Sequence, residues 1–373
     1  MTIRLRHLTL SLLAALAFST GSASAQTRLL GGDISLLPTY EKAGTKFRDT
    51  KGKARPLLRI LKDSHWNAAR VRLFVNPDDA PDENKDEGVC QSLDYITPLC
   101  KLIKSEGMNL MLDFHYSDTW ADPGKQFTPK AWANCSPEQL CDSVYSHTRR
   151  ALRHLKQNGC APDLIQVGNE ITFGMLWPTA KVDPMTDDRW DILASLLKSG
   201  VRACREECPQ ARVIIHTEHA GDCNMTRNYY QRLARYGVDY DIIGLSYYPM
   251  WHKDIPNLSL TLDSIASEFP QKDIMIVETA FYYSHENDRW AKSADEYSDL
   301  YPISEDGQAQ FTRELVAMLK KHPRVTGLYW WFPEENESGN KVIGSWINRG
   351  LFNNRTGRTT KAMAEFEKYL RHE

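Results

Sequence analysis

Residues 164–170 read Leu-Ile-Gln-Val-Gly-Asn-Glu, an apolar run that turns polar and finishes in Asn169 and Glu170. Residues 274–279 read Ile-Met-Ile-Val-Glu-Thr, and this second apolar run ends in Glu278. A short apolar run bounded by polar residues is typical of a buried strand in a parallel sheet. A glutamate that caps a following helix would give the same local pattern, so neither stretch is decisive alone. Together they predict two buried strands that each present a carboxylate at the C-terminal end.

Six further stretches have strand character, and helical segments separate them. The eight expected strands cover residues 31–34, 67–75, 108–115, 164–170, 212–217, 241–249, 274–279 and 327–333. We expect helices near 93–106, 138–157, 188–206 and 307–321, and a terminal helix from about 361. Strands that alternate with helices over this length predict the α/β class and a single (β/α)8 TIM barrel. A doubly wound open sheet is the alternative, weakened by the missing glycine-rich phosphate turn after the first strand.

The barrel interpretation gives the two glutamates a chemical meaning. Active sites of (β/α)8 barrels lie at the C-terminal ends of the strands, and glycosidic cleavage commonly uses a pair of flanking carboxyl groups. Arg70 and Arg72 alternate with Val71 in the second strand, so both arginines should point inward. Inward arginines are costly unless they meet carboxylates, although a purely structural ion pair would also explain them. The pattern predicts a glycosidase with Glu170 and Glu278 as its carboxyl pair.

Polar and aromatic residues also crowd the segment after the third strand. His115, Trp120 and Asp122 all lie between residues 113 and 124. Metal ligation by a set drawn from Asp113, His115, His216 and His219 is conceivable, but no tight ligand spacing supports it. We therefore expect no metal and no cofactor.

Composition and the N-terminus limit the partners. The 373 residues hold 46 Lys and Arg against 48 Asp and Glu, a balance that gives no electrostatic case for nucleic acid or an anionic membrane. Arg4 and Arg6 precede an apolar run over 8–18, and small residues around Ala25 follow. This order predicts a signal peptide over 1–25, cleaved before a catalytic domain over 26–373. The run is shorter than the ~18–20 residues that a membrane anchor needs, so we expect an exported, periplasmic or secreted protein.

The chain contains eight cysteines. An even number in an exported protein permits disulfides, and we expect at least one. No C-x-x-C pair occurs, which argues against a zinc ribbon.

These motifs together resemble glycoside hydrolase family 53, the arabinogalactan endo-β-1,4-galactanases, within clan A of the retaining glycosidases. The resemblance extends over nearly all of the expected domain. It is carried by residues 31–35, 70–72, 75–77, 113–124, 166–171, 174–178, 243–249 and 277–280.

The resemblance implies roles for individual residues. Glu170 would be the acid/base and Glu278 the nucleophile, while Asn169 would bind the sugar 2-hydroxyl. Arg70 would lie beside the nucleophile and lower its pKa, with Tyr247 as its phenolic neighbour, and a less polar setting would raise the pKa of Glu170. The other expected substrate-binding residues are His115, Trp120, Asp122, Trp177, His216, Ser246, Trp251 and Trp331.

The sequence departs from the family pattern at two places. Phe281 and Tyr283 occupy the first two ligand positions of a calcium site found in some bacterial members, so we expect no calcium of that kind. Phe332 replaces the glutamate that usually follows the tryptophan of the last strand, which affects contacts in the loop after it.

The expected substrate is β-1,4-galactan and its oligosaccharides, cut internally by a monomeric enzyme. A clan A β-mannanase or β-glucanase is one alternative, because barrel and carboxylates would be the same. A non-catalytic glycan-binding barrel is another, although it would not need an inward array of arginine and glutamate.

Overall fold

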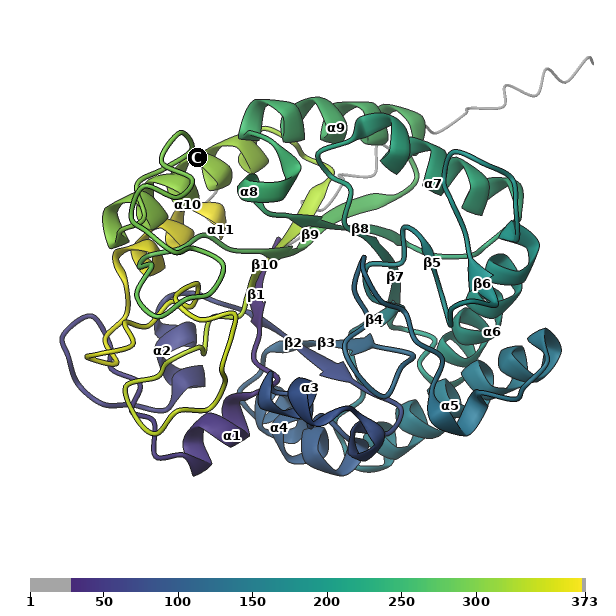
Figure 1. Ribbon diagram of the computed structural model, residues 1–373, viewed down its shortest axis with the longest axis horizontal. Coiled ribbons are helices and arrows are strands. Elements are labelled where there is room, and N and C mark those ends of the chain that lie inside the picture. Colours follow the sequence, from purple (N-terminus) through teal and green to yellow (C-terminus); the bar gives the residue numbers. More distant parts are fainter. Residues whose placement is uncertain (1–27, 371–373) are drawn as a thin grey trace, which may run out of the picture.

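Parallel strands form a closed ring at the centre of the structure, and helices surround the ring (Figure 1). The computed structural model describes residues 28–370. In that part of the chain the barrel has eight strands in the order β1-β10-β9-β8-β7-β4-β3-β2. Their bounds are β1 Leu29–Asp33, β2 Ala68–Leu73, β3 Asn109–Phe114, β4 Leu164–Val167, β7 Arg212–Thr217, β8 Ile242–Tyr247, β9 Asp273–Thr279 and β10 Val325–Trp331. The predicted (β/α)8 barrel is confirmed, and the open-sheet alternative is wrong.

The helices lie close to where the sequence predicts them. They are α1 Leu37–Lys42, α2 Leu57–Asp63, α3 Asp82–Asp86, α4 Leu93–Ser105, α5 Pro137–Gln157, α6 Trp190–Glu207, α7 Cys223–Arg235, α8 Pro249–His252, α9 Ile255–Glu268, α10 Glu305–Lys320 and α11 Glu367–Leu370. The terminal helix expected from residue 361 is mostly a 3-10 helix, Lys361–Phe366, which α11 continues. A small hairpin, β5 Gly174–Met175 with β6 Ala180–Lys181, follows β4.

The interior of the barrel is divided into an apolar and a polar level. Inward side chains near the start of the strands form one apolar cluster: Ala68, Met111, Leu164, Ile214, Ile242, Met275, Val277 and Tyr329. Two residues further along several strands, the inward positions become polar and charged, as at Arg70 and Asp113. Val71 and Leu73 belong to the larger core between strands and helices. The predicted alternation of β2 is confirmed, because Arg70 and Arg72 are fully buried inside the barrel.

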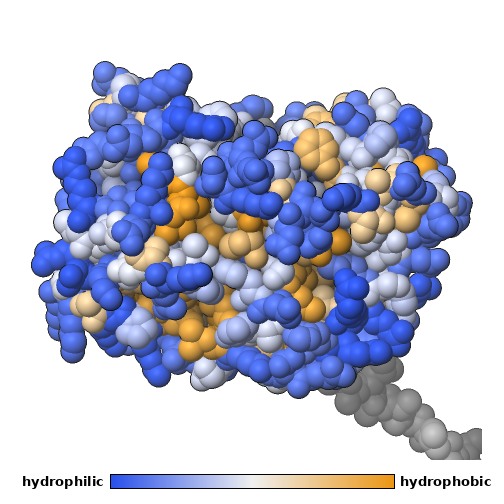
Figure 2. Space-filling model, turned by 60° about the horizontal axis from the view of Figure 1, so that its bottom comes forward, coloured by the Kyte–Doolittle hydropathy of each residue, from blue (hydrophilic) through white to orange (hydrophobic). Residues whose placement is uncertain are grey.

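The outer surface is mostly hydrophilic on the face that Figure 2 shows, and its hydrophobic residues lie mainly in recesses between protruding polar side chains. Within residues 28–370, no helix combines the length and the hydrophobicity that crossing a membrane requires. The signal peptide predicted over 1–25 lies outside the described residues.

The expectation of a disulfide is not met in the structure, where all eight cysteines are free. Cys100, Cys160 and Cys204 are buried in the hydrophobic core and serve there as small apolar side chains. Burial raises the pKa of the Cys204 thiol, so its reactive thiolate form is disfavoured. The even number of cysteines suggested disulfides, but these three cysteines are packed in the core as free thiols.

This arrangement predicts the result of a thiol titration. Protein denatured without reductant should release about eight titratable thiols per chain, equal to a fully reduced control, because all eight cysteines are free. A count of six or fewer in the unreduced sample would restore the disulfide expectation.

Candidate active site

The polar level of the barrel is centred on the guanidinium of Arg70. Its Nη1 lies 3.0 Å from Asp33 Oδ2, and its Nη2 lies 2.8 Å from both Asp113 Oδ2 and Glu278 Oε1. Nη2 also donates to Asn169 Oδ1 at 2.7 Å. These partners come from β1, β3, β9 and the end of β4, so one side chain connects four positions around the ring.

A second layer of contacts supports this centre. Arg72 Nη1 lies 2.8 Å from Asp33 Oδ1, and the Arg72 guanidinium lies over the Trp120 ring. Burial opposes ionisation of Asp33, but the charges of Arg72 and Arg70 outweigh it and lower the pKa. His115 Nδ1 accepts from the Ala121 N–H, and His115 Nε2 lies 2.9 Å from Asp113 Oδ2.

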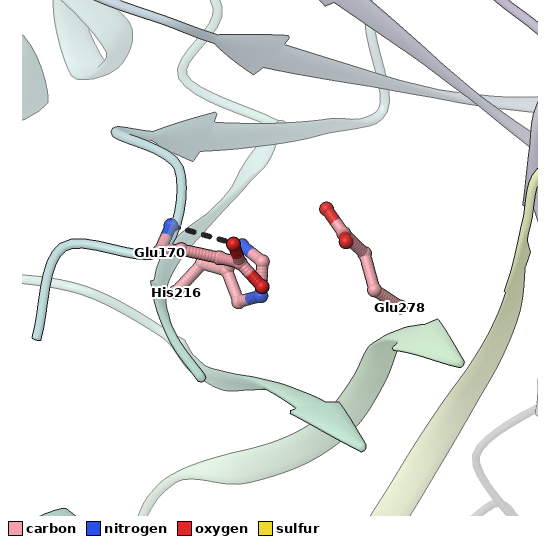
Figure 3. A group of neighbouring side chains, drawn as sticks. All are labelled: Glu170, His216 and Glu278. Atoms are coloured by element: carbon pink, nitrogen blue, oxygen red, sulfur yellow. Dashed lines mark hydrogen bonds between the residues drawn. The ribbon is translucent and has the colours of Figure 1, made fainter. Parts of the chain in front are cut away.

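Glu170 lies across the barrel from Glu278, held by a separate chain of hydrogen bonds. Ser246 Oγ donates to Glu170 Oε1 at 2.6 Å, and His216 Nε2 lies 2.8 Å from the same hydroxyl. The Glu170 backbone N–H donates to His216 Nδ1, the bond drawn in Figure 3. Burial and the nearby Arg70 charge hold the pKa of His216 well below its usual value, so the ring is neutral. Its single proton is therefore on Nε2 and points to Ser246.

The two carboxyl groups face each other across a gap, and His216 lies beside Glu170 (Figure 3). One ligand oxygen of each glutamate and a His216 nitrogen lie within 4.8 Å of one another. Burial raises the pKa of Glu170 well above its usual range, and the charges of Glu278 and Glu218 raise it further. Burial also raises the pKa of Glu278, to about 7, against the lowering effect of Arg70. Arg70 lies beside Glu278 and lowers its pKa as expected, but it does not keep the pKa below the ordinary value, because burial outweighs this effect and the charges of Asp113 and Asp33 oppose it further.

The phenolic neighbour of Glu278 is Tyr248, and the expectation of Tyr247 is wrong. Tyr248 Oη donates to Glu278 Oε2 at 3.0 Å. The Tyr247 side chain points outward, where its ring stacks with Phe311 of α10 and its hydroxyl donates to the Lys253 carbonyl. Side chains alternate along a strand, so the inward position of Ser246 would have indicated Tyr248 from the sequence.

A cleft of about 370 Å³ opens above the two glutamates. Eight of the predicted site residues line it: His115, Trp120, Asp122, Asn169, Glu170, Trp251, Glu278 and Trp331. Arg70, His216 and Ser246 contact the lining residues by hydrogen bonds from behind. Trp177 is not among the lining residues; its indole donates to the Phe173 carbonyl and Lys181 lies over its ring.

Sequence reasoning missed several lining residues besides Tyr248. They are Glu87, Ala121, Pro123, Lys125, Glu218, His252, Arg289, Trp290, Trp346 and Arg349. Glu218 directly follows β7, so its place at a strand end was a usable signal. Trp290, Trp346 and Arg349 belong to the long segments after β9 and β10, where no periodicity indicates which side chains point inward.

The described residues offer one cluster with metal-ligand spacing, formed by Glu170, His216 and Glu278. Arg70 already places a positive charge 2.8 Å from Glu278 Oε1 and would repel a second cation there. Of the set considered from sequence, Asp113 and His115 are in contact, but His219 pairs with Glu218, and the four side chains form no cluster with metal-ligand spacing among the described residues.

The two aromatic residues at the calcium-site positions contribute to packing. Phe281 is fully buried and contacts Tyr301 and Phe311. The hydroxyl of Tyr283 accepts a hydrogen bond from the Asn354 backbone N–H. Phe332, at the other departure from the family pattern, is also buried and packs edge-on against Trp331.

A (β/α)8 barrel with two opposed carboxyl groups at its strand ends has the architecture of a glycoside hydrolase. The chain belongs to glycosyl hydrolase family 53, whose model matches residues 29–366.

Named relatives and solved structures agree with this assignment. A probable arabinogalactan endo-β-1,4-galactanase A of Aspergillus fumigatus is 33% identical over 333 residues, covering 87% of this chain and 88% of the relative. An endo-β-1,4-galactanase of Bacillus subtilis is 32% identical over 307 residues, covering 81% and 69%. The structure of the Ignisphaera aggregans GH53 catalytic domain superposes with a TM-score of 0.83 at 30% identity, covering 94% and 98%.

The tyrosine pair at the end of β8 provides a test of the site geometry. Tyr248→Phe should raise the pKa of Glu278 above about 7, because the lost hydrogen bond favours the ionised carboxylate. Tyr247→Phe is the matched control, since that hydroxyl bonds to a backbone carbonyl on the other side of the strand. A ¹³C NMR titration of side-chain carboxyls, assigned with Glu278→Gln, measures both. Equal shifts in the two variants, or a lower pKa in Tyr248→Phe, would contradict the assignment.

Proposed function

We propose that this protein is an endo-β-1,4-galactanase that cleaves internal bonds of β-1,4-galactan with retention of anomeric configuration. The main support is the opposed pair Glu170 and Glu278 in a chain of family 53. The choice of galactan rests on relatives that carry the name endo-β-1,4-galactanase. Retention is supported by the short gap, because retaining enzymes hold their carboxyl groups ~5–5.5 Å apart and inverting enzymes hold them ~6.5–9.5 Å apart.

In the proposed mechanism Glu278 is the nucleophile. Its carboxylate oxygen forms a bond to the anomeric carbon while the bond from that carbon to the leaving oxygen breaks. Glu170 donates its proton to the leaving oxygen, so the departing chain ends in a neutral hydroxyl. Glu170 then accepts a proton from water as the water oxygen displaces Glu278 and restores both residues.

The electrostatic environments of the two residues support these roles. Arg70 lies 2.8 Å from Glu278 and opposes the burial that raises its pKa to about 7, whereas burial and the charge of Glu278 both raise the pKa of Glu170 well above its usual range. In the proposed active form the ionised nucleophile coexists with a protonated acid. Activity should rise with pH as Glu278 ionises and fall at higher pH as Glu170 loses its proton.

Neighbouring side chains would position the sugar and the catalytic pair. Asn169 is fixed through Arg70, and its Nδ2 donates to the Ala121 carbonyl, which leaves the amide's second hydrogen for the sugar 2-hydroxyl. Ser246 and neutral His216 hold the Glu170 carboxyl at one oxygen.

Aromatic rings along the cleft would bind the apolar faces of the sugars. Trp251 is 47% exposed, and Trp331 and Trp120 form the wall near Glu278. Trp177 leaves this set because it lies outside the cleft lining.

Export and oligomeric state complete the proposal. The basic, apolar and small-residue segments over 1–25 support cleavage of a signal peptide and action on a polysaccharide outside the cytoplasm. We also propose that the enzyme is a monomer without a nucleic-acid or membrane partner.

Digestion of a polysaccharide panel tests the substrate. The protein without residues 1–25 should convert unbranched β-1,4-galactan to a mixture of oligosaccharides, with internal cuts visible as a rapid fall in polymer length. Mannan and cellulose should be cut at least ~100-fold more slowly, since a site built around one sugar's hydroxyls strongly rejects analogues that leave its polar groups unpaired. Preferred cleavage of mannan, or binding of galactan without cleavage, would overturn the proposal.

The two glutamates should fail in different ways. Glu278→Ala should be nearly inactive on every substrate, because the glycosyl-enzyme cannot form. Glu170→Ala should keep activity on an aryl β-galactobioside, whose leaving group needs no proton. Azide should accelerate this variant and yield a β-configured glycosyl azide, which NMR identifies. Exchange of the two phenotypes, or an α-configured first product from the unmodified enzyme, would refute the roles.

A further inference from the structure

Arg349 lies in the wall of the substrate cleft and lacks a polar partner. Its side chain is buried, with 1% of the residue exposed, yet it belongs to the cleft lining. Within residues 28–370, Nε, Nη1 and Nη2 have no hydrogen-bond partner. An arginine is always charged and carries five N–H donors, so this position holds an unsatisfied cation at the edge of the cleft.

Aromatic rings surround the Arg349 guanidinium. Its Cζ lies 4.4 Å from the ring centre of Trp346, 5.3 Å from Tyr282, 5.6 Å from Trp331 and 5.9 Å from Trp251. Cation–π contacts favour the charge but do not use the N–H donors, which point along the plane of the guanidinium. Trp251, Trp331 and Trp346 line the cleft together with Arg349, and the three guanidinium nitrogens lie buried beside these rings.

The backbone holds Arg349 in place. Its carbonyl accepts a hydrogen bond from the buried Trp330 indole at 2.7 Å, and the next amide, of Gly350, donates to Glu335 at 3.0 Å. Trp346 and Asn348 have φ of 64°, a left-handed conformation that side chains other than glycine adopt only where the surroundings enforce it. The position of the cation is therefore built into the fold.

Comparison with the buried arginines of the barrel shows that Arg349 lacks a carboxylate partner. Arg70 and Arg72 are as deeply buried, and both make ion pairs with carboxylates within 3.0 Å. Glu335 is within electrostatic range of Arg349, but burial raises the pKa of Glu335 to about 8, so it is mostly protonated near neutral pH. Arg289, an exposed residue of the same wall, lies 3.8 Å from the carboxylate of Glu87 and so has a partner that Arg349 lacks.

We propose that Arg349 is a specificity-determining residue that binds the carboxylate of a uronic acid unit in the glycan chain. A carboxylate presents two oxygens in a plane, which matches the two-pronged donor geometry of a guanidinium. The sugar ring that carries the carboxylate would lie against Trp346 and Trp251. This inference rests on the proposed galactanase activity and extends its substrate class to galactan chains that carry acidic units.

The test compares a neutral oligosaccharide with an acidic one of the same linkage. The neutral substrate is β-1,4-galactohexaose, and the acidic substrate is the same hexaose with C6 hydroxymethyl groups partly oxidised to carboxylates. The unmodified enzyme should cleave the oxidised chains with kcat/KM at least equal to the neutral value. Arg349→Met should lose ~30-fold or more on the oxidised chains and only a few-fold on the neutral ones, because hydrogen bonds between charged groups are among the strongest.

Two further variants sharpen the comparison. Arg349→Lys keeps the charge without the planar fork and should fall between the other two enzymes on oxidised chains. Arg313→Met is the matched control, since Arg313 lies on α10, is exposed and pairs with Glu365. It should leave the ratio of the two kcat/KM values unchanged.

Several outcomes would overturn the inference. If Arg349→Met lowers kcat/KM equally on both substrates, Arg349 contacts neutral hydroxyls or has a structural role. The same conclusion follows if the unmodified enzyme cleaves oxidised chains with a kcat/KM tenfold below that on neutral chains. If Arg349→Met does not fold, the salt dependence of kcat/KM of the unmodified enzyme and of Arg349→Lys provides the test. Added NaCl should lower kcat/KM on oxidised chains only, and equal salt effects on both substrates would refute the proposal. If neither substrate is cleaved, the galactanase proposal fails, and calorimetric binding of the oxidised chains still tests Arg349.

Discussion

The active-site end of this barrel depends on the buried charge of Arg70. A guanidinium in a dry interior is stabilised only when carboxylates and other acceptors surround it. Here they come from Asp33 on β1, Asp113 on β3 and Glu278 on β9. Each of these carboxylates can reach the cation only when the barrel is closed in this register. The same contacts therefore stabilise the closed barrel and position Glu278. Loss of one partner would leave an uncompensated charge at a cost of about 3–5 kcal/mol, a large part of a typical stability of ~5–15 kcal/mol.

Sharing the charge also sets the electrostatics of the proposed catalytic pair. Burial raises the pKa of Glu278 to about 7 against the lowering effect of Arg70, and the charges of Asp113 and Asp33, which pair with the same cation, raise it as well. Glu170 lacks any cation at hydrogen-bond distance among the described residues, and burial together with the charge of Glu278 raises its pKa well above the usual range. The difference between the two environments, rather than a low pKa at either residue, separates the proposed nucleophile from the proposed acid.

The sequence was informative wherever a strand imposes a period. Alternation in β2 correctly predicted inward arginines, and the apolar runs before Glu170 and Glu278 correctly predicted two strand ends. The mistaken choice of Tyr247 was a one-residue error in the alternation at the end of β8, which the inward Ser246 could have corrected.

No such rule applies to the segments after β9 and β10, because tertiary contacts determine where a loop side chain points. Trp290, Trp346 and Arg349 were therefore missed, and Trp177 was wrongly expected in the cleft. The disulfide expectation failed for a related reason, since composition records how many cysteines exist and not where packing puts them.

The two levels of the barrel interior divide the work between stability and specificity. Below the arginines, apolar residues such as Met111 and Ile214 fill the ring and need no partner beyond each other. At the level of Arg70 the two buried arginines pair with carboxylates from neighbouring strands. Above it, the loop residue Arg349 is equally buried but meets aromatic rings in place of carboxylates. The central arginines have carboxylate partners within the barrel, whereas Arg349 in the cleft wall has none. Substitutions in the loops can therefore change the substrate that the cleft binds, because they leave the contacts of the catalytic centre unchanged.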